Sequence, residues 1–266
     1  MIRFDCAIRH RDGTPVIKDV QIEEYAQMLL ADYNRNLLSG LPEKIDPFHF
    51  VEVYLGAKLD FQDIYYEDDE QPIYGLTCFN DDRIRVFDRE HMTVTQIKVK
   101  AGTIILDNVL LRRGRESLLL FTLLHEAGHF CMHREVFDRM YARGCQERFC
   151  HRRKEPGKKN SRRLETQKDF REHQANVFAA AIAMPRQTME PCADKMIRCA
   201  GFPEGVFVTG LSCDNIKQKY LEQLILSFAK AYGVSNDAAR IRLEKIGKIQ
   251  SYTNYMRTHD HLYVFA

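Results

Sequence analysis

The chain has 266 residues, a net charge of +2 and an apolar content of 45%. This composition is ordinary for a globular protein and excludes wholesale disorder and fibrous repeats. No apolar run approaches the ~18 residues that a membrane span needs, and the charged N-terminus does not resemble a signal peptide. Eight cysteines without a Cys-x-x-Cys pair indicate reduced thiols. We therefore expect a cytoplasmic protein that does not interact with membranes.

The first 110 residues contain both helical and strand patterns. Apolar side chains recur at three- and four-residue steps between Val20 and Leu38, which predicts an amphipathic helix. Asp46 and Pro47 are typical of the start of a second helix. Short segments rich in β-branched residues follow, at 59–64, 75–79, 83–87, 93–99 and 102–106. The gaps between them are too short for crossover helices, so we expect one antiparallel or mixed sheet of four or five strands.

The chain is mostly helical from Glu116 onward. Apolar periodicity predicts helices over 118–133, 171–184, 214–232 and 235–246. Pro185 ends the second of these, because proline cannot continue a helix interior. A basic segment, residues 134–168, separates the first two helices and has no obvious core residues. The predicted fold class is therefore α+β, with a small N-terminal sheet and a helical C-terminal half.

The motif His125-Glu126-Ala127-Gly128-His129 lies within the predicted helix 118–133. Histidines at i and i+4 leave the same face of a helix one turn apart, where both imidazoles can bind one zinc ion. Glu126 lies beside the first histidine and can act as the general base toward a water activated by the metal. The alternative is a packed or solvated helix face with Glu126 in an ordinary ion pair.

A catalytic zinc ion needs a third protein ligand, and two residues are candidates. His133 continues the same helix face, but a straight helix cannot place three successive turns around one ion. We therefore expect His133 to end the helix or to hydrogen-bond a ligand. Glu172 lies on a predicted helix face rich in alanine, which would allow close approach to the zinc helix; by its spacing alone it could equally be a surface charge. Asn176, one turn later, could hydrogen-bond the second nitrogen of a histidine ligand.

These residues together resemble the ImmA/IrrE family of metallopeptidases. The resemblance rests on Leu120 to His129, on His133, and on the pattern Glu172-x-x-Ala175-Asn176-x-Phe178-Ala179-Ala180-x-Ile182-x-Met184-Pro185. The segments Gly102 to Asp107 and Phe228 to Leu243 are also similar to that family. The resemblance covers roughly residues 45–247. The basic segment, the residues before Ile45 and the tail 252–266 lie outside it.

The resemblance implies a zincin-like, gluzincin-type zinc endopeptidase. Its metal ligands would be His125, His129 and Glu172, and Glu126 would be the general base. The substrate would be a protein, typically a helix-turn-helix transcriptional repressor of a mobile element or stress response. We accordingly divide the chain into an N-terminal extension, a zinc peptidase domain and a C-terminal helical subdomain with its tail: 1–44, 45–200 and 201–266. The alternatives are a non-catalytic, zinc-stabilised regulator that binds a repressor or DNA, and a toxin–antitoxin component.

Three weaker patterns remain. Cys145, Cys150 and His151, with Cys131 and His133, could form a second zinc site, although buried or loop thiols are the preferred interpretation. Residues 224–243 fit a DNA-binding helix-turn-helix, but packing onto the catalytic domain is favoured because Ile241, Leu243 and Ile246 would be partly buried. The aromatic tail from Tyr252 could be a terminal strand or a docking segment.

The small net charge hides an uneven distribution. Residues 134–171 hold 13 Lys and Arg against 6 Asp and Glu. This basic segment lies between the second zinc histidine and the predicted third ligand. It is either a solvated loop or a flap that recruits an acidic partner, or nucleic acid bound to that partner.

Overall fold

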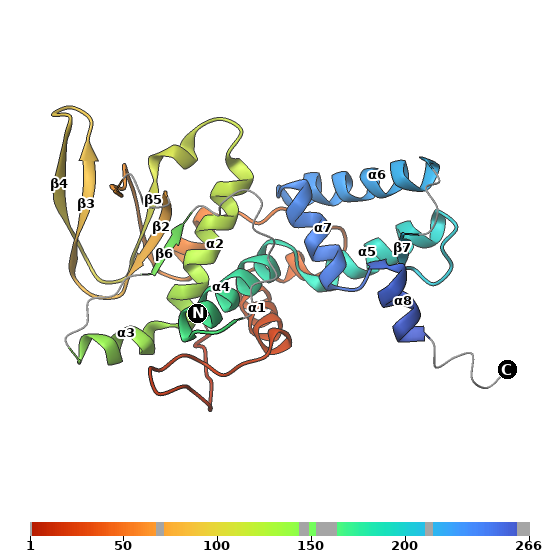
Figure 1. Ribbon diagram of the computed structural model, residues 1–266, viewed down its shortest axis with the longest axis horizontal. Coiled ribbons are helices and arrows are strands. Elements are labelled where there is room, and N and C mark those ends of the chain that lie inside the picture. Colours follow the sequence, from red (N-terminus) through yellow and green to blue (C-terminus); the bar gives the residue numbers. More distant parts are fainter. Residues whose placement is uncertain (1, 68–71, 144–148, 153–163, 211–214, 260–266) are drawn as a thin grey trace. The chain divides into compact units, whose positions relative to one another are not determined.

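The computed structural model describes residues 2–67, 72–143, 149–152, 164–210 and 215–259 (Figure 1). The protein has the predicted α+β composition and divides into two compact units. The first unit contains Met1–Asn34 and Ile45–Ala183, and the second contains Arg35–Lys44 and Met184–Ala266. Residues 1–34 therefore belong to the same compact unit as the motif His125 to His129, whereas the predicted division placed residues 1–44 in a separate N-terminal extension.

The first unit contains a mixed four-stranded sheet in the order β1-β5-β2-β6. Its strands are β1 (Lys58–Gln62), β2 (Ile73–Cys78), β5 (Thr103–Asp107) and β6 (Phe149–Arg152). β1 pairs with β5 in parallel, and β2 pairs antiparallel with both β5 and β6. The prediction of a mixed sheet is confirmed, but the prediction that it holds all of the early strands is wrong. β3 (Asp82–Asp88) and β4 (Thr93–Val99) form a separate hairpin, because they pair with each other along their whole length.

The two faces of the central strand β2 have different neighbours. Leu76 and Cys78 belong to a hydrophobic cluster with Ile84 and Val86 of the β3–β4 hairpin. Gly75 and Thr77 of β2 face helix α2 (Glu116–Met132) on the other side. Figure 1 shows the hairpin and α2 on opposite sides of β2 and β5. Because strand side chains alternate between faces, one short strand supports both a hydrophobic core and the helix of the zinc motif.

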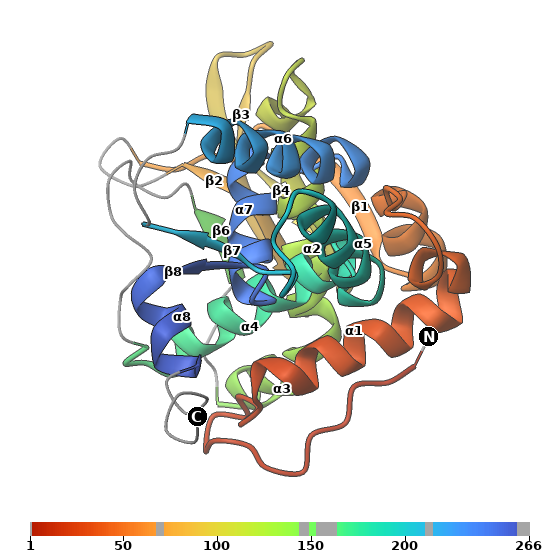
Figure 2. The same cartoon turned by 90° about the vertical axis from the view of Figure 1, so that its right-hand side faces the viewer.

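Helix α2 packs against α4 (Gln167–Ala183), which in turn packs against α1 (Asp19–Asn34; Figure 2). All three helices were predicted, with ends that differ by a few residues. The helix predicted at Asp46 is also present, with the carboxylate of Asp46 accepting from the backbone amides of Phe48 and His49. It continues as a π-helix over His49–Tyr54. A 3-10 turn, Asn108–Leu111, leads from β5 toward α2.

The basic segment 134–168 contains regular structure, which corrects its description as a segment without core residues. Helix α3 (Arg134–Tyr141) buries Val136 and Phe137 completely or nearly so. The ring of Phe137 stacks on that of Phe79 with centroids 4.5 Å apart. Further along the same segment, β6 extends the sheet beyond β2. These residues have too few apolar neighbours in sequence to indicate a core, and only the tertiary contacts bury them.

The second unit is mostly helical. It contains a 3-10 turn (Arg35–Leu38), α5 (Arg186–Cys199), α6 (Asn215–Tyr232), α7 (Asn236–Lys245) and α8 (Tyr252–His259). β7 (Phe207–Thr209) and β8 (Ile249–Ser251) form a small parallel pair. The predicted helices α6 and α7 are confirmed, and the hydroxyl of Ser235 caps α7 as expected. Helix α5 and the two strands were not predicted, and the tail begins as a helix where a strand was considered.

None of the helices in the described part of the chain combines the length and the apolar character that crossing a bilayer requires.

Candidate metal centre

The structure brings the three predicted zinc ligands together. The Nε2 atoms of His125 and His129 are 3.1 Å apart. The carboxylate of Glu172 lies 3.4 Å from the first of these atoms through Oε2, and 3.5 Å from the second through Oε1. Both histidines are fully buried, while the side chain of Glu172 keeps 30% of its exposure. The three groups therefore form a site that is enclosed on the histidine side and open beside the carboxylate.

Two helices place these side chains within reach of one another. His125 and His129 are one turn apart on α2, and Glu172 comes from α4. The helices approach closely at Gly128, where an added Cβ would lie 3.1 Å from the Cα of Ala175. A larger residue at this point would push α4 outward and move the carboxylate away from the imidazoles. The small residues predicted to allow a close approach thus have this role at the contact of α2 with α4.

The geometry fits a tetrahedral metal ion. Ligand atoms bound at ~2.0–2.1 Å in a tetrahedron are separated from each other by about 3.3–3.4 Å. The observed separations of 3.1, 3.4 and 3.5 Å lie close to this value. Two imidazoles and one carboxylate are also a donor set that zinc accepts, with one position left for water or substrate. The residues present therefore fit a zinc ion.

A hydrogen bond to the second ring nitrogen of His125 leaves its Nε2 atom suitable for a metal. Nδ1 of His125 lies 3.1 Å from Oδ1 of Asn176, and an amide oxygen only accepts. In its neutral form His125 therefore carries its proton on Nδ1 in this contact, so that the lone pair of Nε2 faces the site. Burial alone would lower the pKa of His125, but the carboxylates of Glu172 and Glu126 outweigh it and raise that pKa.

His133 lies behind His129 and has no ring nitrogen left for a metal. Its Nδ1 is 2.9 Å from Nδ1 of His129, and its Nε2 is 2.8 Å from Oε1 of Gln174. Burial lowers the pKa of His133 to about 3, so this imidazole is neutral at neutral pH. The structure thus places His133 and Asn176 where the sequence analysis expected supporting residues, each bonded to one of the predicted ligands.

Glu126 is completely buried between α2 and β2. The hydroxyl of Thr77 lies 2.6 Å from its Oε2 and donates to it. Gly75, on the same strand face, leaves room for this carboxylate, since an added Cβ there would lie 3.0 Å from Cγ of Glu126. Thr77 and Gly75 were not predicted as site residues, because nothing in the sequence indicates which strand packs on helix α2.

The second predicted metal site cannot be assessed in the same way. Cys145 and the side chains of Cys150 and His151 lie outside the described residues. Of their proposed partners, His133 uses both ring nitrogens for His129 and Gln174. Among the described residues, one group of three or more metal-binding side chains is found, and it consists of His125, His129 and Glu172.

The helix pair α6–α7, considered as a DNA-binding motif, has only part of its basic surface exposed. Arg242 is buried and its Nε donates to the carbonyl oxygen of Met184. Arg240 is exposed but forms an ion pair with Glu244 at 3.1 Å. Leu243 is fully buried, as expected for packing within a folded unit. Arg242 is therefore part of the interior of the second unit and is not exposed on its basic surface.

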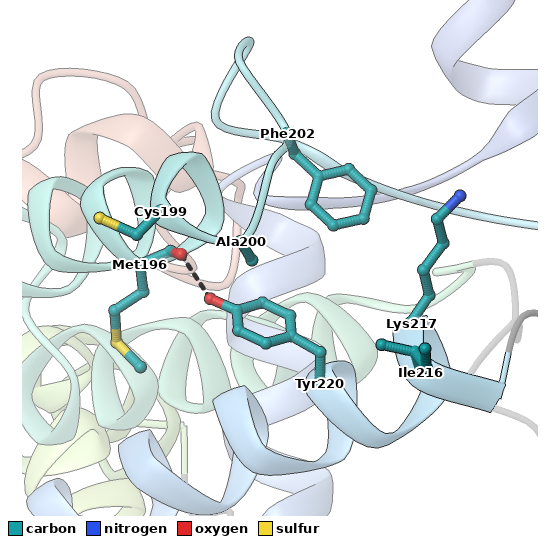
Figure 3. A pocket seen from close by; sticks show the side chains of 7 residues that line it. All are labelled: Met196, Cys199, Ala200, Phe202, Ile216, Lys217 and Tyr220. Carbon is teal, nitrogen blue, oxygen red and sulfur yellow. Dashed lines mark hydrogen bonds between the residues drawn. The ribbon is translucent and has the colours of Figure 1, made fainter.

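The second unit also contains a cavity of about 370 Å³ (Figure 3). In its lining, the hydroxyl of Tyr220 donates a hydrogen bond to the carbonyl oxygen of Met196. Its lining is mainly apolar and includes neither a carboxylate nor an imidazole: Met196, Cys199, Ala200, Phe202, Ile216, Lys217 and Tyr220. This lining therefore offers no carboxylate or imidazole that could bind a metal or act as the base in hydrolysis.

Comparison with known proteins adds no assignment. No protein-family model matches this chain, and no curated protein matches it either. The resemblance to the ImmA/IrrE family therefore stays a prediction from the sequence motifs.

Proposed function

We propose that this protein is a zinc-dependent endopeptidase with the zincin-like, gluzincin-type arrangement of the ImmA/IrrE family. The observation that supports this most strongly is the convergence of His125, His129 and Glu172, whose ligand atoms all lie within 4.8 Å of one another. The buried carboxylate of Glu126, next in sequence to the first ligand, adds the proton acceptor that hydrolysis needs. A purely structural zinc site would not require a buried carboxylate such as Glu126 beside its ligands.

Each residue then has a defined part in the reaction. His125, His129 and Glu172 would hold Zn²⁺, which lowers the pKa of water and polarises a peptide carbonyl at its open position. Glu126 accepts the proton of the attacking water and delivers it to the leaving amine. The hydroxyl of Thr77 donates to one carboxylate oxygen of Glu126 and would fix the orientation of this base.

The substrate that we propose is a helix-turn-helix transcriptional repressor. This part of the proposal comes from the resemblance alone. The excess of positive charge between residues 134 and 171 is compatible with an acidic protein partner.

The test is incubation of the purified, zinc-loaded protein with a helix-turn-helix repressor encoded beside it, followed by mass spectrometry of the fragments. We expect cleavage at one or a few peptide bonds, and none after chelation of the metal. The matched variants are Glu126→Gln, which should keep zinc and lose cleavage, and the exposed Glu165→Gln, which should keep both. Full biological function of Glu126→Gln would instead support a non-catalytic regulator or a toxin–antitoxin component. Cleavage that persists in metal-free protein would overturn the proposal.

A further inference from the structure

The N-terminal arm, defined as residues 9–19, folds into a compact turn. The amide of Val16 donates to the carbonyl oxygen of Ile8, and the amide of His10 donates to that of Thr14. Gly13 stands at the turn with a φ of +95°, a conformation that residues with a side chain rarely adopt. An added Cβ on Gly13 would also lie 3.2 Å from the Cα of Val136 in α3. The arm therefore packs closely against helix α3 within the first unit.

The arm binds the residues of α4 that flank the predicted ligand Glu172. Nη1 of Arg171 donates to Oδ2 of Asp12 at 2.7 Å and to Oγ1 of Thr14 at 2.9 Å. Nε2 of His173 lies 2.7 Å from Oδ1 of Asp19. Two residues after the ligand, Nε2 of Gln174 donates to the carbonyl oxygen of Pro15 at 2.8 Å. These bonds secure the turn of α4 that carries the carboxylate ligand.

The bond to Pro15 also sets the direction of a longer hydrogen-bond chain. A backbone carbonyl only accepts, so the amide of Gln174 must present its NH₂ group to Pro15 and its oxygen to His133. Nε2 of His133 must then carry a proton and donate it to that oxygen at 2.8 Å. In a neutral His133, Nδ1 is left as an acceptor, and it receives the Nδ1 proton of His129 at 2.9 Å.

The last link determines which nitrogen of His129 can bind a metal. With its proton on Nδ1, His129 has its lone pair on Nε2, the atom that faces His125 and Glu172. If the amide of Gln174 were reversed, every donor and acceptor in the chain would reverse, and Nε2 of His129 would be protonated. A metal ion cannot bind a protonated nitrogen.

We propose that the N-terminal arm is a positioning element of the metal centre: the carbonyl of Pro15, through Gln174 and His133, fixes the tautomer of His129 that binds zinc. This inference rests on the proposed zinc site but not on peptidase activity. It gives a role to residues of the arm, which lie outside the stretch covered by the family resemblance, and it makes Gln174 a positioning residue rather than a ligand or a catalytic residue.

The direct test measures tautomers in the full-length, metal-free protein. Long-range ¹H–¹⁵N spectra of ¹⁵N-histidine-labelled protein distinguish an imidazole with its proton on Nδ1 from one with its proton on Nε2. We expect His129 in the Nδ1–H form and His133 in the Nε2–H form. Gln174→Met preserves side-chain length but removes both hydrogen bonds, and it should leave His129 and His133 as mixtures of the two forms. Gln167→Met, an exposed position in the same helix, is the matched control and should not change the spectra.

Zinc affinity provides the second readout, by competition with a chromophoric chelator. Loss of a partner that orients a histidine ligand typically weakens metal binding about 10–100-fold, and we expect Gln174→Met to fall in this range while Gln167→Met binds as the wild type does. Wild-type His133 with its proton on Nδ1, or equal zinc affinity in the two variants, would overturn the proposal. If Gln174→Met fails to fold, the wild-type spectra still decide. If the tautomers and zinc affinities are as expected but the repressor stays uncleaved, the peptidase function is rejected and the role of the arm still holds.

Discussion

The contact of α2 with α4 in the first unit and that of α6 with α7 in the second are both helix contacts around a core, but they bury different side chains. The first buries His125, His129 and His133, and α2 also buries Glu126 against β2. The second buries mainly leucine, phenylalanine and alanine side chains, with Arg242 bonded to a backbone carbonyl. Burying a polar or charged group costs free energy unless it is fully bonded. Helix α2 alone buries four such groups, which agrees with the proposed hydrolytic chemistry, whereas the α6–α7 contact buries mainly apolar side chains.

The largest expected effect tests whether the polar groups between α2 and α4 bind a metal. Glu172→Gln removes a charged ligand while keeping the shape of the side chain. We expect zinc affinity to fall by more than the ~100-fold that loss of an outer partner costs. Chelator competition on the full chain measures it, with Glu165→Gln as the control. Equal affinity in both variants would mean that Glu172 is only a surface charge.

A second prediction compares a buried ion pair in the first unit with an exposed one in the second. The side chain of Arg171 is only 4% exposed, and Asp12→Ala leaves its charge without this carboxylate. We expect the free energy of unfolding to fall by about 3 kcal/mol, because an uncompensated buried charge is expensive. Glu244→Ala breaks the exposed pair with Arg240 and should cost less than ~1 kcal/mol. Urea unfolding of each variant measures the difference; similar losses would contradict the contrast between the units.

A third prediction uses one buried threonine from each unit. Thr77 donates to the carboxylate of Glu126, and Thr188 shares a hydrogen bond of 2.8 Å with Tyr232. A hydrogen bond to a charged group contributes ~1.5–3 kcal/mol, and ~1.4 kcal/mol corresponds to a factor of ten in rate. We therefore expect Thr77→Val to lower kcat roughly tenfold or more with little change in KM, and Thr77→Ser to restore it. Thr188→Val should reduce stability by ~1 kcal/mol and leave kcat unchanged. An equal loss of kcat in both valine variants would indicate a general effect of destabilisation.

The smallest expected effect is a pH dependence of stability that arises from Asp12. Burial would raise the pKa of this carboxyl, but hydrogen bonds from Thr14 and the charge of Arg171 outweigh it and lower the pKa below its ordinary value of 3.8. A carboxyl with a lowered pKa stabilises the fold above its ordinary pKa, and this contribution is lost as the pH falls through the lowered value. In metal-free protein, the stability difference between wild type and Asp12→Asn should therefore be full at pH 6 and shrink below pH 4. A difference that stays constant down to pH 3 would contradict it.

Local patterns were sufficient for the centre of the site. The spacing of His125 and His129 places both imidazoles on one helix face whatever surrounds them, because helical periodicity is a property of the local chain. The alanines around Glu172 indicated a close helix contact, and the contact of Gly128 with Ala175 has that geometry. The caps at Asp46 and Ser235 were also correct, since a cap depends on residues at most three positions away.

Residues that act over long sequence distances were not predictable in this way. Thr77 is separated from Glu126 by 49 positions, and Pro15 from Gln174 by 159. A threonine in a strand and a glutamine in a helix have no pattern that indicates a buried partner. In the basic segment, Val136 and Phe137 appeared to be isolated apolar residues because their partner Phe79 comes from another part of the chain.

The sequence by itself predicted helices α1, α2, α4, α6 and α7 and the His125–His129 pair, because these follow from spacing within a few turns. Glu172 was a candidate ligand from its alanine-rich helix face and from the family resemblance. Only the tertiary structure decided which strand hydrogen-bonds Glu126, which amide hydrogen-bonds His133, and that residues 1–34 belong to the unit of the candidate metal centre. The physical reason is that an imidazole or a carboxylate becomes a ligand or a base through the donors and acceptors around it. Those partners are brought together by folding and not by proximity in the chain.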